Sequence, residues 1–185
     1  TAVNAAYEET EPRSFVKRRA LALGLTVGAV LFVALAIFVI ALLPAVASGL
    51  GLPDVARTLL SILRWPVLGA LLLGALSMLY RLAPNRQDAR WSWVSPGAVV
   101  ATVLWLAGSI LFSIYTANFG SYNETYGSLG AVVIVMLWLL LTAFSVILGA
   151  EVNAELERQT HRDTTTGPER PMGQREAYVA DTVGA

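Results

Sequence analysis

The sequence predicts an all-α fold, a polytopic transmembrane helix bundle with four spans in this chain, and three observations support it. Apolar residues make up 56% of the 185 residues and charged residues only 14%, against about 25% charged in ordinary soluble domains. Mean hydropathy is +0.61 over the whole chain. Four apolar segments are each long enough to cross a bilayer, because ~30 Å of hydrocarbon takes about 20 helical residues. They cover about residues 20–43, 62–82, 94–119 and 129–150.

Any one of these segments could be a buried helix in a soluble core, but four of them in one short chain favour a membrane protein. Residues 1–155 are therefore predicted to form a membrane domain. Residues 156–185 are polar and contain too little apolar surface to fold alone, so a disordered cytoplasmic tail is predicted. A solvated tail is favoured over a regulatory or partner-binding segment.

The distribution of basic residues predicts the topology. Eleven of the thirteen Lys and Arg residues lie before the first span, between the second and third, or after the fourth. Arg57 and Arg64 alone lie between the first two spans, and residues 120–128 contain none. Because positive residues accumulate on the cytoplasmic side, both ends and the 83–92 loop are predicted inside. Zero net charge gives no global basic field, so no nucleic-acid partner is predicted.

The first span follows a polar approach in which Ser14 is a candidate helix cap. Its Gly24-x-x-x-Gly28 spacing permits close helix packing, although small residues are common in such helices. Pro44 is predicted to end this helix on the outer side. The chain begins at Thr1 with no apolar signal-peptide core, so we expect a piece of a longer chain.

A short helix lying in the outer interface is predicted before the second span, because residues 53–64 have apolar side chains on one face and polar ones on the other. A lid over a cavity is the alternative interpretation. Trp65 and Pro66 then indicate an aromatic belt residue and a kink. The second span has a close-packing stripe of Ala70, Gly74 and Ser77.

The third span is predicted to start at Ser95-Pro96, since proline fits the first helical turn. The third and fourth spans both carry polar side chains, which at membrane depth must face other helices or a wet cavity. Helix packing is favoured over cavity lining, because Ser and Thr can bond to their own helix backbone. The hydroxyls concerned are those of Ser109, Ser113, Thr116, Thr142 and Ser145.

Glu151 is the one carboxylate placed right at the end of a span. It is a candidate for binding a cation or proton. Pairing with Arg81, Arg86 or Arg90 of the inner loop, or solvation at the interface, is the more common arrangement for such a group. Asn153 follows one half-turn later.

Between residues 95 and 157 the chain resembles the YihY/BrkB family, historically labelled ribonuclease BN, and residues 4–17 are similar to the family's segment before its third helix. The positions that carry the resemblance are Pro96, Gly97, Ala98, Trp105, Tyr115, Tyr122, Tyr126, Gly127, Trp138, Gly149, Ala150, Glu151 and Asn153. Without the two alanines, and with Ser109 and Ser113 added for their hydroxyls, these are also our candidate functional or packing positions. The resemblance implies a six-helix protein of the bacterial inner membrane with cytoplasmic termini. It also implies that two N-terminal spans are missing here, and it brings no settled activity.

Nuclease chemistry is not predicted, and the chain is predicted not to be an enzyme. Phosphodiester hydrolysis needs a metal cluster or an organised acid–base set. The single histidine, His161, lies in the polar tail, and no cysteine is present. No catalytic residue, cofactor or metal site is therefore predicted.

Two function classes remain. In the first, the helices move a solute or lipid across the membrane, as the hydroxyls, the Tyr122–Tyr126 turn and Glu151 indicate. In the second, the protein is a membrane scaffold or assembly partner, as the small-residue stripes and the lack of a fully intramembrane charge indicate. Transport is slightly favoured. The expected partners are the lipid bilayer and either a second copy or another membrane protein, with the substrate unknown.

Overall fold

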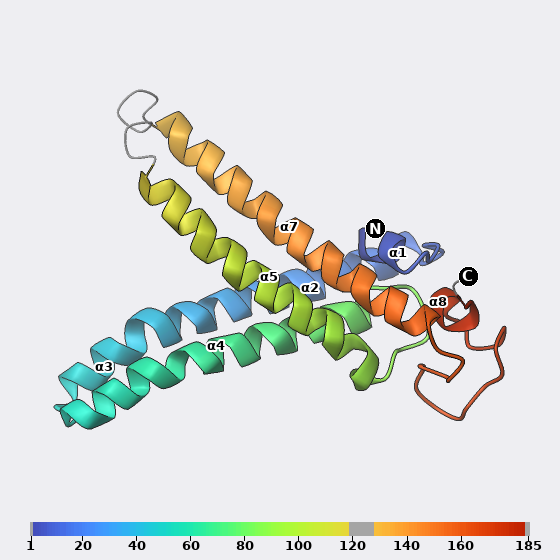
Figure 1. Ribbon diagram of the computed structural model, residues 1–185, viewed down its shortest axis with the longest axis horizontal. Coiled ribbons are helices and arrows are strands. Elements are labelled where there is room, and N and C mark those ends of the chain that lie inside the picture. The colour runs from blue at the N-terminus through green and yellow to red at the C-terminus, as the bar shows by residue number, and fades with distance from the viewer. Residues whose placement is uncertain (1, 119–127, 184–185) are drawn as a thin grey trace. The chain divides into compact units, whose positions relative to one another are not determined.

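The computed structural model describes residues 2–118 and 128–183, which fold into helices (Figure 1). Their order is α1 (Ala2–Ala6), α2 (Phe15–Ile37), the π-helical segment η1 (Phe38–Leu42), α3 (Leu43–Gly49), α4 (Asp54–Leu82), α5 (Trp91–Asn118), α7 (Ser128–Arg158) and α8 (Tyr178–Asp181). The described residues contain no strand, only an isolated antiparallel bridge between Ala89 and Thr165. The all-α prediction is confirmed.

Four helical stretches are long and apolar enough to cross a membrane: Phe15–Gly49, Asp54–Leu82, Trp91–Ala117 and Leu129–Arg158. Their large apolar side chains are mostly exposed, for example Leu111 at 67% and Leu140 at 65%. An apolar surface of this size is a lipid or protein contact surface rather than a water-facing one. The prediction of four spans is confirmed, and the helices extend beyond the predicted apolar segments.

The chain divides into two compact units, one of residues 12–79 and one of residues 1–11 and 80–185. In the smaller unit the first span does not end at Pro44, which corrects the prediction. The helix passes through η1, where the Leu43 N–H donates to the Phe38 carbonyl, and Pro44 occupies the first turn of α3. Proline is tolerated there because it lies in the first turn of α3, just after the π-helical segment, where its missing N–H removes little backbone hydrogen bonding.

The predicted interfacial helix is likewise not separate from the second span. α4 runs without a break from Asp54 to Leu82 with Pro66 inside it. At ~1.5 Å per residue its 29 residues are about 43 Å long, so one end extends beyond ~30 Å of hydrocarbon. The amphipathic pattern of residues 53–64 therefore belongs to the first turns of a long membrane helix.

In the larger unit α5 and α7 lie side by side along much of their length (Figure 1). α5 begins at Trp91 rather than at Ser95, and Pro96 lies inside it. The Ser95 hydroxyl donates to the Trp91 carbonyl at 2.9 Å, one turn earlier. The predicted helix start is therefore wrong by one turn.

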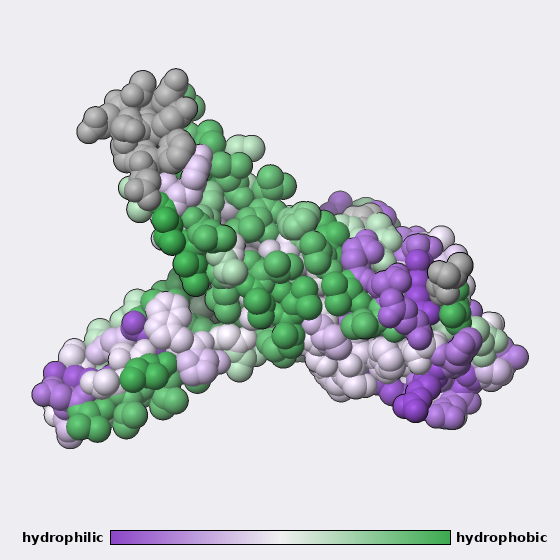
Figure 2. Space-filling model, in the orientation of Figure 1, coloured by the Kyte–Doolittle hydropathy of each residue, from purple (hydrophilic) through white to green (hydrophobic). Residues whose placement is uncertain are grey.

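A polar assembly, which we call the terminal cap, lies at one end of this helix pair. It consists of residues 2–11, 83–90 and 159–183, and Figure 2 shows its hydrophilic surface next to the apolar surface of the helices. α1 and α8 both contact α7, and the Asn4 side chain accepts a hydrogen bond from the Asn85 N–H at 2.9 Å. The segments before the first span, between the second and third, and after the fourth thus meet at one end, as an even number of spans requires.

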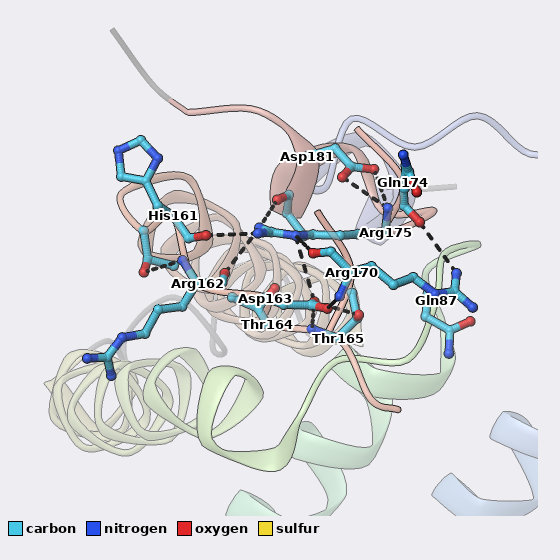
Figure 3. Close-up of polar contacts among 12 residues, drawn as sticks. Gln87, His161, Arg162, Asp163, Thr164, Thr165, Arg170, Gln174, Arg175 and Asp181 are labelled. Atoms are coloured by element: carbon cyan, nitrogen blue, oxygen red, sulfur yellow. Dashed lines mark hydrogen bonds and ion pairs between the residues drawn. The ribbon is translucent and has the colours of Figure 1, made fainter. Parts of the chain in front are cut away.

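Residues 159–183, for which a disordered tail is predicted, make buried polar contacts with one another. The Arg175 guanidinium donates to the carbonyls of His161 at 2.8 Å and Ala180 at 2.6 Å (Figure 3). Asp163 is buried, which raises its pKa, but hydrogen bonds from Thr165 and the Arg170 N–H and the nearby Arg175 lower that pKa below its usual value. These contacts satisfy buried polar groups and bury little apolar surface.

Candidate functional site

The closest approach of α5 and α7 is at Gly97 and Gly149. A Cβ atom added at Gly97 would lie 2.0 Å from the Gly149 carbonyl oxygen, and one added at Gly149 would lie 2.6 Å from the Gly97 oxygen. Real Cβ contacts are never that short, so any side chain here must push the helices apart. The two glycines form a crossing at which backbone packs against backbone.

Asn153 joins the two helices at this crossing. Its side chain is fully buried at 0% exposure. The Oδ1 atom accepts from the Gly97 N–H at 2.7 Å, and the Nδ2 group donates to the Val94 carbonyl at 3.1 Å. One side chain of α7 therefore satisfies a donor and an acceptor of the α5 backbone.

Tyr80, near the end of α4, completes this arrangement. Its hydroxyl donates to the Val146 carbonyl of α7 at 2.8 Å. The Tyr80 hydroxyl also lies beside Gly149, 2.3 Å from where a Cβ would be. Gly149 is thus enclosed by three helices, and we call Gly97, Gly149, Asn153 and Tyr80 the crossing cluster.

A buried ion pair lies next to the crossing cluster, inside the terminal cap. The Arg86 guanidinium donates to both carboxylate oxygens of Glu157, at 3.1 and 2.6 Å. Their side chains are 2% and 0% exposed. The Thr164 hydroxyl donates to the same carboxylate at 2.7 Å. Bidentate geometry and a third donor are the conditions under which a buried pair is tolerated.

Tyr7 places the N-terminal segment against this ion pair. The Arg86 guanidinium lies 5.1 Å from the centre of its ring, within cation–π distance. The Tyr7 hydroxyl is buried near Asn153 and has no hydrogen bond of ordinary geometry to any described residue. Burial first, and then the Glu157 carboxylate, raise the Tyr7 pKa.

Further along the helix pair, Trp105 and Trp138 meet edge to face. Their ring centres are 5.8 Å apart and their planes are inclined by 67°. The Trp105 indole N–H donates to the Thr142 hydroxyl at 3.0 Å, and that hydroxyl donates in turn to the Trp138 carbonyl. This layer fills the space between the helices with aromatic rings.

The hydroxyls of the two spans mostly bond to their own helices. Thr116, Thr142 and Ser145 each donate to a carbonyl three or four residues earlier. The Ser109 hydroxyl is buried without a partner among the described residues, and Ser113 is exposed. The hydroxyls therefore do not form a continuous polar stripe between the described parts of α5 and α7.

An open groove of about 620 Å³ lies along the helix pair beyond the aromatic layer. Tyr115 is one of its walls, and its ring stacks on Phe112 with centres 6.3 Å apart. The remaining walls are nearly all apolar. The lining residues, which define the apolar groove, are Gly108, Leu111, Phe112, Tyr115, Leu137, Leu140, Leu141 and Phe144.

Glu151 lies on an exposed face of α7 and has no ion-pair partner among the described residues. Of the two common arrangements considered for Glu151, pairing with the inner-loop arginines is not observed, which leaves solvation at the interface. Arg81 instead lies 3.7 Å from Asp88, Arg86 binds Glu157, and Arg90 donates to the Thr165 carbonyl. Helical geometry explains the difference, because Glu157 and Asn153 share the buried face of α7 and Glu151 does not.

The remaining candidate positions are Pro96 in α5 and three residues of the segment between α5 and α7. Pro96 is half-buried in α5 and lies next to the crossing at Gly97. Tyr122, Tyr126 and Gly127 lie outside the residues that the structure describes. The structure therefore brings together Gly97, Gly149 and Asn153, and in a separate layer Trp105 and Trp138.

Sequence reasoning missed Tyr7, Tyr80, Arg86 and Glu157 as members of a site. A signal was present in the helical spacing at the end of the fourth span. The buried residues Ala150, Asn153, Ala154 and Glu157 follow an i, i+3, i+4, i+7 pattern, which marks one buried helix face. That pattern extends past residue 155, where the tail was predicted to begin.

The virulence factor BrkB family model matches residues 1–173. The chain belongs to the BrkB family. The ribonuclease-like protein YfkH of Bacillus subtilis is 35% identical over 85% of this chain and 58% of its own length. A UPF0761 membrane protein of Rhodospirillum centenum is 30% identical over 97% of this chain and 39% of its own length. No solved structure matches.

The chain thus spans about half the length of these curated BrkB-family relatives. The match identifies a multi-pass membrane protein of a family with no established activity. Within residues 2–118 and 128–183, no group of three His, Cys, Asp or Glu side chains could hold a metal ion. The chemistry that the described residues offer is packing, ion pairing and apolar contact.

Proposed function

We propose that this BrkB-family chain takes part in moving membrane lipid, with the apolar groove as the surface that receives an acyl chain. The observation that carries this proposal is the composition of the groove walls, which are almost entirely hydrocarbon over about 620 Å³. A polar solute would need hydrogen-bonding groups along its path. The hydroxyls of α5 and α7 are mostly committed to their own backbones, so lipid is the better supported cargo.

The crossing cluster and the buried ion pair fit the role of a closed end in such a protein. They fasten the helices through short hydrogen bonds to Asn153 and Glu157, while the groove beyond the tryptophan layer stays open. The basic residues of the terminal cap support a cytoplasmic location for this end. No catalytic step is proposed, and the ribonuclease-like name of the Bacillus relative is not carried over to this chain.

Filling the groove tests this function. Leu111→Trp places a large ring in the groove from a position that is 67% exposed, so folding should be retained. In proteoliposomes, we expect the variant to slow transfer of a fluorescent phospholipid between leaflets by about tenfold, equivalent to ~1.4 kcal/mol in the barrier. Chemical quenching of the outer-leaflet fluorophore measures the transfer rate.

Val103→Trp is the matched control, because Val103 is 59% exposed on the same helix but does not line the groove. It should transfer lipid at the unmodified rate. Equal rates for the unmodified protein, both variants and protein-free vesicles would contradict a lipid-transfer role.

A scaffold function is the second candidate, and one observation favours it. A Cβ added at Gly24, Gly28, Gly69 or Gly74 would have no described atom within 4 Å. Small-residue surfaces of this kind suit contact with another membrane helix. Absence of lipid transfer together with a stoichiometric membrane partner, recovered by crosslinking, would favour this function instead.

A further inference from the structure

A second hollow lies in the unit formed by residues 12–79, between η1–α3 and the first turns of α4. Its volume is about 310 Å³. The wall from η1 and α3 is apolar and includes Val39 and Pro44, whereas the wall from α4 carries Arg57, Thr58, Ser61 and Arg64. We call this the arginine pocket. It holds Arg57 and Arg64, the two basic residues in the first half of α4.

The π-helical turn shapes the apolar wall of the arginine pocket. In η1 the Leu43 N–H donates to the Phe38 carbonyl five residues earlier, which widens the helix compared with an α-helical turn. Pro44 follows directly and supplies no N–H donor of its own. Isolated π-helical turns inside α-helices are frequent at functional sites.

The contacts of Arg64 indicate that the pocket binds a ligand. Its Nε atom is buried and has no hydrogen-bond acceptor, and its guanidinium has no ion-pair partner among the described residues. The Trp65 ring lies next to the guanidinium, with its centre 5.3 Å away. If the hydrocarbon begins at about residue 62, as the sequence predicts, Arg64 lies about 3 Å inside the membrane boundary. An uncompensated guanidinium at that depth is costly, so an anionic partner is expected.

Arg57 supplies the second positive charge. It lies 3.7 Å from Asp54, whose side chain is 98% exposed, so this pair is weak and leaves Arg57 free to bind an anion. The hydroxyls of Thr58 and Ser61 donate to the carbonyls of Asp54 and Thr58, at 2.9 and 2.8 Å. Their oxygens can therefore still accept hydrogen bonds from a ligand.

We propose that the arginine pocket binds the headgroup of an anionic phospholipid of the phosphatidylglycerol type. The two guanidiniums match its phosphate, and the two hydroxyl oxygens match the hydroxyl donors of its glycerol. Lipid is favoured over free phosphate because the opposite wall is apolar and Arg64 lies at the depth of the first membrane turn. Basic pockets between membrane helices bind lipid headgroups in this way. The site is distinct from the apolar groove, and equilibrium binding to it does not depend on lipid transfer.

The neighbouring Trp65, which is 60% exposed, provides a local reporter. In phosphatidylcholine vesicles holding an increasing share of brominated phosphatidylglycerol, Trp65 fluorescence should be quenched more strongly than by brominated phosphatidylcholine. Subtracting the signal of a Trp65→Phe variant isolates this residue from the other tryptophans. We expect Arg64→Gln to reduce the preference for phosphatidylglycerol roughly fivefold, the factor that one arginine at an anionic surface contributes.

Arg19→Gln is the matched control, since Arg19 also lies over an aromatic ring, 5.1 Å from the centre of Phe15, but does not line the pocket. Arg19→Gln should leave the preference for phosphatidylglycerol unchanged, and an unchanged melting temperature verifies that Arg64→Gln folds.

Equal quenching by the two lipids, or a preference for phosphatidylglycerol that survives Arg64→Gln, would overturn the proposal. A saturable change of Trp65 fluorescence on adding inorganic phosphate to pure phosphatidylcholine vesicles would assign the pocket to free phosphate instead. Loss of lipid transfer with this preference intact would count only against the function proposed for the groove.

Discussion

Glu157→Ala is expected to lower the free energy of unfolding by about 3–5 kcal/mol, because it leaves a buried guanidinium without its counter-charge. Arg86 is only 2% exposed, and both of its Nη groups bind the Glu157 carboxylate. The Thr164 hydroxyl loses its acceptor in the same variant. Titration of the protein in mixed micelles with a denaturing detergent, followed by circular dichroism, measures the change.

Two further variants show whether the effect comes from the buried charge. Glu151→Ala removes a carboxylate from an exposed position on the same helix and should change the free energy of unfolding by less than about 0.5 kcal/mol. Arg86→Met combined with Glu157→Leu should recover most of the loss, because apolar replacement of a buried pair is often close to neutral. If Glu157→Ala unfolds at the same detergent concentration as Glu151→Ala, the buried ion pair does not exist in the protein.

Gly97→Ala is expected to have the second largest effect, a destabilisation of about 1–3 kcal/mol or more from overpacking. The new methyl group would lie 2.0 Å from the Gly149 carbonyl oxygen and 2.6 Å from the Asn153 side chain. The helices must separate to accommodate it, which lengthens both Asn153 hydrogen bonds. The same detergent titration detects the loss.

Gly74→Ala is the control for this variant, since no described atom lies within 4 Å of the added methyl group. Alanine has the higher helix propensity, so Gly74→Ala should be neutral or stabilising by up to ~1 kcal/mol. Two glycine variants with equal stability would mean that α5 and α7 do not cross at Gly97.

The number and kind of helices could be predicted because crossing a bilayer depends on length and apolar composition alone. Helix ends were predicted less well, and two prolines show why. Pro44 indicated a helix end and Pro96 a helix start in the sequence, but both lie within helical stretches. Pro66, which indicated a kink, also lies within a helix. In a long apolar segment, lipid offers no water to bond freed backbone groups, so the helix continues around the proline.

The candidate site was partly predictable. Gly97, Gly149 and Asn153 were identified by resemblance, and the structure explains them as one crossing. Glu157 was missed because a charged residue past the last apolar run suggested a tail, while the helix continued to Arg158. Its partner Arg86 is 71 residues away, and no local pattern links residues at that separation.

The contacts of the tail could not be predicted for the same reason. Arg175 is held by carbonyls of residues 161 and 180, contacts that composition does not encode. A polar segment was expected to remain solvated because it buries little apolar surface. The partners of Arg175 and Asp163 are visible only in the three-dimensional arrangement.

The terminal cap is the central feature of this account, and a disulfide between its loop and its tail tests it most directly. Ala89 and Thr165 face each other in an antiparallel bridge, with the Arg90 N–H donating to Thr164 and the Thr166 N–H donating to Asp88. Such non-hydrogen-bonded pairs have Cα atoms ~4.5 Å apart, within the range of ~4.4–6.8 Å that a disulfide needs. These 185 residues contain no cysteine, so within them the introduced thiols can pair only with each other.

The measurement is oxidation of the Ala89→Cys, Thr165→Cys double variant in native membranes, followed by trypsin digestion and electrophoresis with and without reductant. We expect a rapid intramolecular disulfide that holds the two fragments together until it is reduced, with no crosslink in either single variant. The terminal cap would be contradicted if the two thiols stayed unpaired and the thiol introduced in the tail reacted with a water-soluble maleimide as fast as it does in the unfolded chain.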